Sequence, residues 1–214
     1  MKKQTLFISL CAISALFITG CANSRLAAVH SVTVDSNVAR PKKLEYADQA
    51  SQNAGALGVL FIGALPGALI QKGMSAGPRK EIEGTAASKE IAIEKIVPAV
   101  FADELSRSGL FTVNQQGGGD ATVHLKVPAY QLIHKSGMFG RPTLAPGVVI
   151  EAQFAGSNGR NFYGIGKGGY AAKENWHTQA EYKENPELLR AGWEEAARVT
   201  TRAIIAQIRK KMPK

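Results

Sequence analysis

The alternation of apolar and polar residues predicts strands in two parts of the chain. Apolar residues occupy every second position over residues 121–127, and the same alternation returns over residues 148–154. A hairpin-turn signal, Ser-Asn-Gly at residues 157–159, is followed by an expected return strand over residues 160–170. β-Branched residues at 29–34 predict an earlier strand. Because the alternating strands have one apolar and one polar face, they predict an antiparallel sheet.

Apolar residues at helical spacing predict two helices. Residues 85–107 form the first, in which Pro98 either causes a kink or begins a second helix at its first turn. Residues 186–211 form the second, with Asn185 as the N-cap. Its apolar stripe is expected to cover the sheet and comprises Leu189, Trp193, Ala196, Ala197, Thr200, Ala203, Ile204 and Ile208. The opposite, solvent-facing side is expected to carry Glu187, Glu194, Glu195, Arg198, Arg202 and Arg209.

The length and composition suit one globular domain. Of 214 residues, 45% are hydrophobic and 20% are charged, which excludes a wholly disordered chain and a polytopic membrane protein. The expected fold class is α+β, an antiparallel sheet with helices packed on one face, in a single domain over residues 29–214. The formal net charge of +9 favours anionic partners such as lipid headgroups. No nucleic-acid partner is expected, because the aromatic residues are not interleaved with basic ones.

The first twenty residues have the pattern of a secretory signal peptide. Lys2 and Lys3 precede an uncharged apolar run at residues 6–18, which small and polar residues follow. This run is shorter than the roughly 20 apolar residues that cross a bilayer, so cleavage is favoured over anchoring. Residues 1–20 are therefore assigned to a signal peptide that is removed.

Residues 18–21, Ile-Thr-Gly-Cys, resemble the lipobox of bacterial lipoproteins. The resemblance implies that the thiol of Cys21 receives a diacylglycerol and that residues 21–28 form a lipidated tether. Two or three fatty-acyl chains such as palmitate would hold the protein on a membrane almost permanently. Cys11 leaves with the signal peptide, so no intramolecular disulfide is expected. In a Gram-negative host, Ala22 in place of Asp predicts sorting to the outer membrane, facing the periplasm.

A glycine-rich, apolar segment at residues 49–77 is the unusual feature of the mature chain. Its most apolar part is residues 54–70, where Gly63 and Gly67 have a spacing that lets two backbones approach closely. Pro66 and the short length argue against a full membrane span. The segment is expected to pack on the protein or to lie on the bilayer. Ile62, Gly63 and Gly67 are the candidate contacts with the membrane or with a second copy in a homo-oligomer.

The motifs for catalysis and cofactor binding are weak. Residues 164–169 match the spacing GxGxxG, but no amphipathic helix follows, which favours a bulged or edge strand over a dinucleotide site. The histidines are isolated in sequence, and no cysteine remains to join them in a zinc site; they are His30, His124, His134 and His177. A serine nucleophile elbow is also absent. We therefore expect no enzyme activity, no cofactor and no metal.

The chain resembles the YajG-like group of accessory lipoproteins. The resemblance lies in the last helix and in three stretches, residues 101–113, 120–127 and 148–170. They are more distantly similar to curli-secretion and penicillin-binding-protein-activator lipoproteins. The resemblance implies a membrane-anchored accessory or scaffolding protein that binds another envelope protein. Two alternatives stay open. One is an oligomeric pore or secretion-complex component that uses residues 54–77, and the other is a glycan-binding or hydrolytic envelope module.

Overall fold

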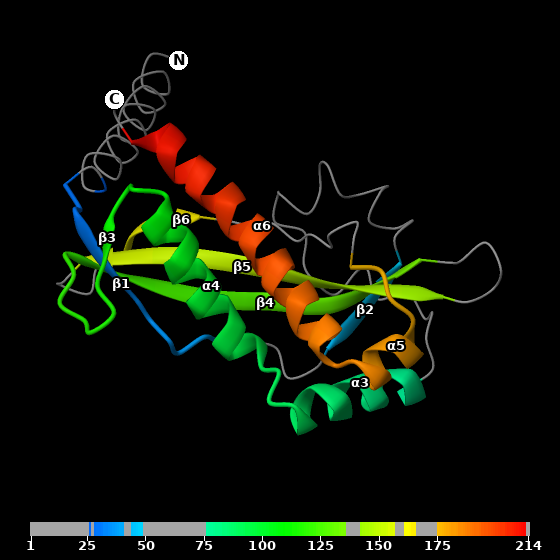
Figure 1. Ribbon diagram of the computed structural model, residues 1–214. Coiled ribbons are helices and arrows are strands. Elements are labelled where there is room, and N and C mark those ends of the chain that lie inside the picture. The colour runs from blue at the N-terminus through cyan, green and yellow to red at the C-terminus, as the bar shows by residue number, and fades with distance from the viewer. Residues whose placement is uncertain are drawn as a thin grey trace, which may run out of the picture.

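The structure is a computed structural model that describes residue 26 and residues 28–40, 44–48, 76–135, 142–156, 161–165 and 175–212. The predicted signal peptide, Cys21 and residues 49–75 lie outside the described residues, so they stay predictions. Within the described part, six strands form one sheet, and two long helices cover one of its faces (Figure 1). The predicted α+β class, with helices packed on one face, is confirmed.

The sheet is built around two long strands, β4 (Ala121–Lys135) and β5 (Thr143–Gly156), which pair antiparallel. The expected return strand is present as β6 (Asn161–Ile165), antiparallel to β5. On the other side, β1 (Ser31–Val34) and β2 (Glu45–Asp48) both pair in parallel with β4. A short strand, β3 (Thr112–Val113), pairs in parallel with β1 at the edge.

The sheet is therefore mixed, which corrects the expectation of an antiparallel sheet throughout. Parallel neighbours need a crossover of a dozen or more residues between them. The helices α3 (Ala76–Ser88) and α4 (Ile93–Arg107) lie between β2 and β4 in the sequence and form this crossover. The alternation within one strand does not depend on the direction of its neighbour, so the sequence pattern could not reveal this pairing.

The two long helices, α4 and α6 (Glu187–Lys211), pack against each other, and α6 also packs on β5 (Figure 1). α4 buries Val97, Phe101 and Leu105 against the sheet. The predicted stripe of α6 is confirmed at Trp193, which is 2% exposed, and at Leu189, Ala196, Ala197, Thr200, Ile204 and Ile208. Ala203 is exposed, so its assignment to the stripe was wrong. Thr201 and Ile205 are buried instead.

The helix expected over residues 85–107 is divided into two. α3 ends at Ser88, and Glu90 adopts a left-handed backbone with φ of 52°. The backbone N–H of Ile91 then donates to the carbonyl of Ala86 at 2.9 Å, which closes the end of α3. Pro98 lies inside α4 and does not begin it. The break therefore has its origin at Glu90 and not at the proline.

A short helix, α5 (Gln179–Glu184), precedes α6 and was not expected from the sequence. Its N-terminus is a capping box, in which Thr178 Oγ1 accepts from the backbone N–H of Glu181 and Glu181 accepts from the N–H of Thr178. Tyr182 is buried, and its hydroxyl donates to the carbonyl of Leu144 on β5 at 2.9 Å. α5 thus holds the chain on the sheet just before α6 begins.

Candidate functional site

A cavity of about 450 Å³ lies where α3, α4, β4 and α6 meet. The connection between α3 and α4 forms part of its wall, and the first turn of α4 forms another part. No side chain caps the N-terminus of α4, whose preceding residue is Ala92. The backbone N–H groups of Lys95 and Ile96 donate to the carbonyl of Ala92 at 3.0 Å, so at most the first two N–H groups of the helix can serve an acceptor in the cavity.

Two aromatic side chains line this cavity from different elements. Tyr130 comes from β4 and Trp193 from α6, and their rings meet edge to face with centroids 6.0 Å apart. The indole Nε1 of Trp193 is buried and has no hydrogen-bond partner. A buried donor without an acceptor costs about 1–3 kcal/mol. A bound acceptor close to the indole would remove this cost.

Arg40 links the aromatic residues to the rim of the cavity. Its Nε lies 2.9 Å from Glu94 Oε2, and its guanidinium carbon lies 5.8 Å from the centroid of the Tyr130 ring. Its Nη1 donates to the Tyr130 hydroxyl over a long distance of 3.5 Å. Burial raises the pKa of this hydroxyl, while Arg40 lowers it. The hydroxyl of Tyr130 is therefore protonated at neutral pH and can donate a hydrogen bond to a ligand.

The charges around the cavity are mixed. Arg40 and Lys95 contribute positive charge, and Glu83, Glu90 and Glu94 contribute negative charge. Glu83 accepts from the backbone N–H of Leu44 at 3.0 Å, which holds its carboxylate in place. An aromatic lining with both donors and carboxylate acceptors suits a neutral polar molecule better than an anion.

A second, open groove of about 640 Å³ runs along α4 beside β1 and the residues that follow β3. Val34, Pro98 and Ala99 supply apolar surface, and Asp103 and Lys95 supply charges. It has no aromatic side chain among its lining residues and no buried polar group without a partner. The lining of the groove therefore indicates a ligand class less clearly than the lining of the cavity at Trp193 does.

An ion cluster between α4 and α6 centres on Glu104, which is only 5% exposed. Arg202 donates to it through two nitrogens, at 2.7 and 3.2 Å. Arg198 Nε lies 3.3 Å and Arg107 Nη1 lies 3.7 Å from the same carboxylate. Hydrogen bonding to Arg202 is the largest cause that lowers the pKa of Glu104. This cluster joins two helices and lines neither of the two cavities described above, which favours a structural role.

The cluster corrects the assignment of Arg198 and Arg202 to a purely solvent-facing side of the last helix. Both arginines reach across to Glu104 of α4. Glu104 was missed, although it follows Val97 and Phe101 at helical spacing. A carboxylate at a core position of this kind is a signal that a basic partner lies nearby.

The candidate site residues from the sequence lie outside the described residues: Cys21, Ile62, Gly63 and Gly67. Of the GxGxxG match, Gly164 and Ile165 lie on β6, as the edge-strand interpretation predicts, and the rest is outside the described ranges. His124 is exposed, with Nδ1 3.0 Å from Asp35 Oδ2.

Across the described ranges, no cluster of three or more metal-ligating side chains occurs. None of the helices in these ranges is long and apolar enough to span a bilayer.

Comparisons with known proteins add little to this description. No protein-family model matches the chain, and no curated protein matches it. A solved structure from Xanthomonas campestris, described as a DUF330 protein, shares 13% identity over 84% of this chain and 83% of its own, with a TM-score of 0.38. A minor lipoprotein from Acinetobacter baumannii shares 10% identity over 84% and 92%, with a TM-score of 0.33. Likenesses at this level carry no argument about function, and the YajG-like resemblance stays a prediction.

Proposed function

We propose that this chain is a lipid-anchored protein of the bacterial cell envelope with a non-catalytic accessory role. The observation that carries the proposal is the apolar run at residues 6–18 that ends in Ile-Thr-Gly-Cys at residues 18–21. The described fold supports it, because Leu26 is already buried in the core. Only a short tether separates Cys21 from the domain, as in a protein held close to a membrane.

The non-catalytic role is supported by the groups around the cavity. Glu94 is engaged by Arg40, and Glu83 is engaged by the backbone N–H of Leu44. Both carboxylates are thus already held by contacts within the protein. The cavity is therefore better suited to binding than to bond cleavage, and an envelope protein or glycan is the proposed partner.

Metabolic labelling with a palmitate analogue tests the anchor. We expect label in the wild type, none in Cys21→Ser, and accumulation of unprocessed precursor in that variant, because the lipid is attached through the thiol. Cys11→Ser is the matched control, since it removes the other thiol of the chain and should leave labelling unchanged. Palmitate label on Cys21→Ser protein would contradict the proposed anchor.

Sorting within the envelope needs a separate measurement. The wild type is expected in outer-membrane density fractions, and Ala22→Asp is expected to move it to the inner membrane. This expectation depends on the resemblance to lipoproteins in which Asp after the cysteine retains the protein there. Wild-type protein found mainly in inner-membrane fractions would contradict outer-membrane sorting without affecting the anchor.

A glycan-binding function is the second candidate, and the cavity at Trp193 favours it. The hydroxyls of a sugar can pair with Arg40, with the Tyr130 hydroxyl and with the carboxylates on the rim. The chain has two tryptophans, so Trp176→Phe leaves Trp193 as the only indole fluorophore. Peptidoglycan fragments should then change the Trp193 emission in a saturable way.

Two tyrosine variants make this test specific to the cavity. Tyr130→Phe keeps the ring and removes the hydroxyl, so we expect binding about 3- to 10-fold weaker. Tyr182→Phe removes a buried hydroxyl that donates to the carbonyl of Leu144, and it should leave the affinity unchanged. An unaltered emission spectrum at saturating fragment would eliminate glycan binding at this cavity.

A further inference from the structure

The end of the domain at the start of β1 is fixed close to Cys21. Leu26 is buried, and its carbonyl accepts from the backbone N–H of Val29 at 3.1 Å. The N–H of Thr112 donates to the carbonyl of His30 at 2.8 Å, which joins this part of the chain to β3. Five residues beyond Cys21 reach Leu26, and even an extended chain of that length spans only about 17 Å. A lipid on Cys21 would therefore hold this end of the domain near the bilayer.

The C-terminal end of α6 lies at the same end of the molecule. Arg209 Nη2 donates to the carbonyl of Ser108 at 3.0 Å, and Ser108 stands four residues before Thr112, the partner of Ser31 in the sheet. Figure 1 shows the end of α6 and the start of β1 at one end of the fold. The last turn of α6 carries Arg209, Lys210 and Lys211, all exposed.

We propose that this end of the domain faces the membrane and that Arg209 and Lys210 contact the headgroups of anionic phospholipids. The proposal rests on the proposed acylation of Cys21. Asp120 lies at the same end, where its carboxylate accepts from the backbone N–H groups of His30 and Ser31 at 2.9 Å. These backbone N–H groups partly offset the negative charge of Asp120, whereas α6 brings three basic side chains to this end. Each basic side chain near an anionic leaflet strengthens binding about fivefold.

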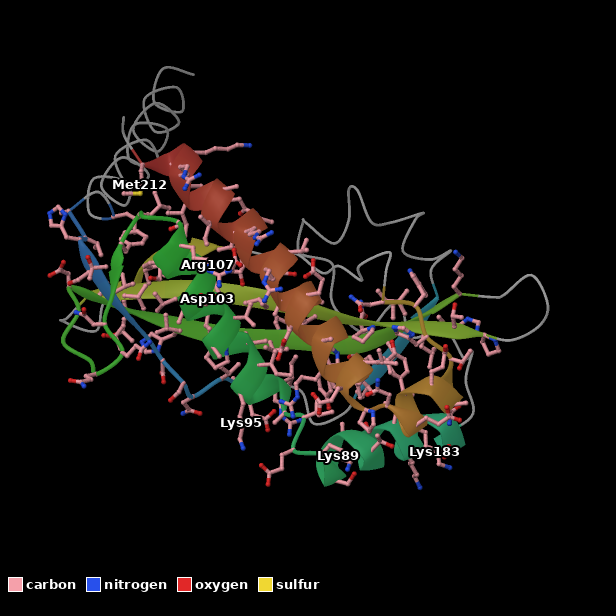
Figure 2. All side chains as sticks on the ribbon, in the orientation of Figure 1. Lys89, Lys95, Asp103, Arg107, Lys183 and Met212 are labelled. Carbon is pink, nitrogen blue, oxygen red and sulfur yellow. The ribbon has the colours of Figure 1, made fainter. Side chains whose placement is uncertain are left out.

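The other end of α6 lies beyond the reach of the surface charge in this orientation. Arg190 Nη2 donates to the carbonyl of Lys89 at 3.3 Å, so the start of α6 packs beside the end of α3. The 19 residues from Arg190 to Arg209 extend over about 28 Å of helix. The Debye length at physiological ionic strength is only about 8 Å. Figure 2 shows Lys89 and Met212 at opposite ends of α6.

Two exposed alanines of α6 provide matched reporters of this orientation. Ala206 lies near the basic end and Ala191 near the other end, and both are exposed. The full chain would be expressed as Ala206→Cys or Ala191→Cys, purified in its acylated form and labelled with a fluorophore on the new thiol. It would then be reconstituted in phosphatidylcholine vesicles that carry nitroxide headgroups, with or without phosphatidylglycerol.

We expect the label at Ala206 to be quenched several-fold more strongly than the label at Ala191, in vesicles that contain phosphatidylglycerol. The double change Arg209→Glu and Lys210→Glu should reduce this quenching, whereas Lys89→Glu with Lys95→Glu should not. Equal quenching at the two alanines, or quenching that phosphatidylglycerol does not affect, would overturn the proposal. If the protein floats with vesicles but shows equal quenching, the anchor stands and only the orientation fails. Absence of palmitate label would overturn both.

Discussion

Glu104 is a carboxylate in an otherwise apolar interface, held there by arginines from both long helices. Removing a carboxylate from water is costly, and two hydrogen bonds from Arg202 offset much of that cost. A missing partner would leave an uncompensated charge between α4 and α6. The cluster therefore makes one alignment of these helices more favourable than neighbouring ones.

Glu104→Gln should lower the free energy of unfolding at neutral pH by about 1–3 kcal/mol, less than for a wholly enclosed pair because Arg202 and Arg107 are partly solvated. The folded-state pKa of Glu104 is below its usual 4.5. Its stabilising effect is therefore present above about pH 4.5 and is lost as the pH falls through the folded-state value. Urea titrations between neutral and acid pH should show the two proteins converging. Glu184→Gln, at an exposed site, is the control and should match the wild type throughout.

Trp193→Ala should lower the free energy of unfolding by about 3–5 kcal/mol, because the ring is buried between α6 and the sheet. Lys210→Ala, exposed on the same helix, should change it little. Arg198→Ala is expected to fall between them, since it removes one cation from Glu104. Thermal melts of the three variants decide the order. A Trp193→Ala protein that melts with Lys210→Ala would contradict the packing of α6.

The contact between α6 and β5 depends on a glycine. A Cβ built on Gly192 would lie 2.6 Å from Cγ and 2.9 Å from Cδ of Pro146 on β5. The proline ring cannot turn away, so the two elements would have to separate. Close approach of backbone to sheet is thus needed at this one point of the helix.

Gly192→Ala should cost about 1–3 kcal/mol of stability through this overlap. Gly84→Ala on α3 makes the same chemical change where no atom lies within 4 Å of the new Cβ. It should instead stabilise the protein by about 0.5–1 kcal/mol, because alanine is the better helix former. Chemical denaturation of both variants checks the pair, and stabilisation by Gly192→Ala would show that the helix stands further from the sheet.

The elements differ in how well the sequence predicts them. α6 has an apolar stripe over 25 residues, and residues 121–127 and 148–154 alternate within β4 and β5, so periodicity is sufficient to predict these three elements. It does not predict the full length of the two strands, because residues 144–148 of β5 are all buried. α5 has six residues and depends on a capping box, which is too local to produce a stripe. The break between α3 and α4 depends on the left-handed backbone of Glu90, for which the residue type gives no signal. β1 and β2 both pair in parallel with β4, which lies far along the chain, so no local pattern reveals this pairing.

The candidate cavity could not be predicted from the sequence, because it exists only once four elements have packed. Arg40 and Tyr130 are 90 residues apart, and Trp193 lies further along the chain. Each looks ordinary in its own segment: a basic turn, a strand residue and a core residue. The predicted lipid site differs in kind, since four adjacent residues define it and no folding is required to recognise it.

At the scale of the whole molecule, the predicted contact of residues 49–77 with the bilayer or with a second copy can be tested at Ile62. Ile62→Asp should weaken a contact with lipid or with another subunit, because an unpaired carboxylate is costly in either place. Limited proteolysis and native mass measurements on acylated protein in vesicles should then differ from the wild type. Ile62→Asn is the uncharged control, expected to have a smaller effect. Indistinguishable profiles for all three proteins would rule out both contacts.

The length of α6 has a consequence for where a partner can be met. Trp193, at the cavity, and Arg209, at the basic end, are 16 residues apart on one helix, or about 24 Å. A continuous helix does not stretch, so the cavity would open at a nearly constant height above the bilayer whenever the basic end rests on it. A partner embedded in the same membrane could reach the cavity only if part of it extended that far from the bilayer. A partner in the aqueous space beside the membrane could bind at the cavity without such an extension.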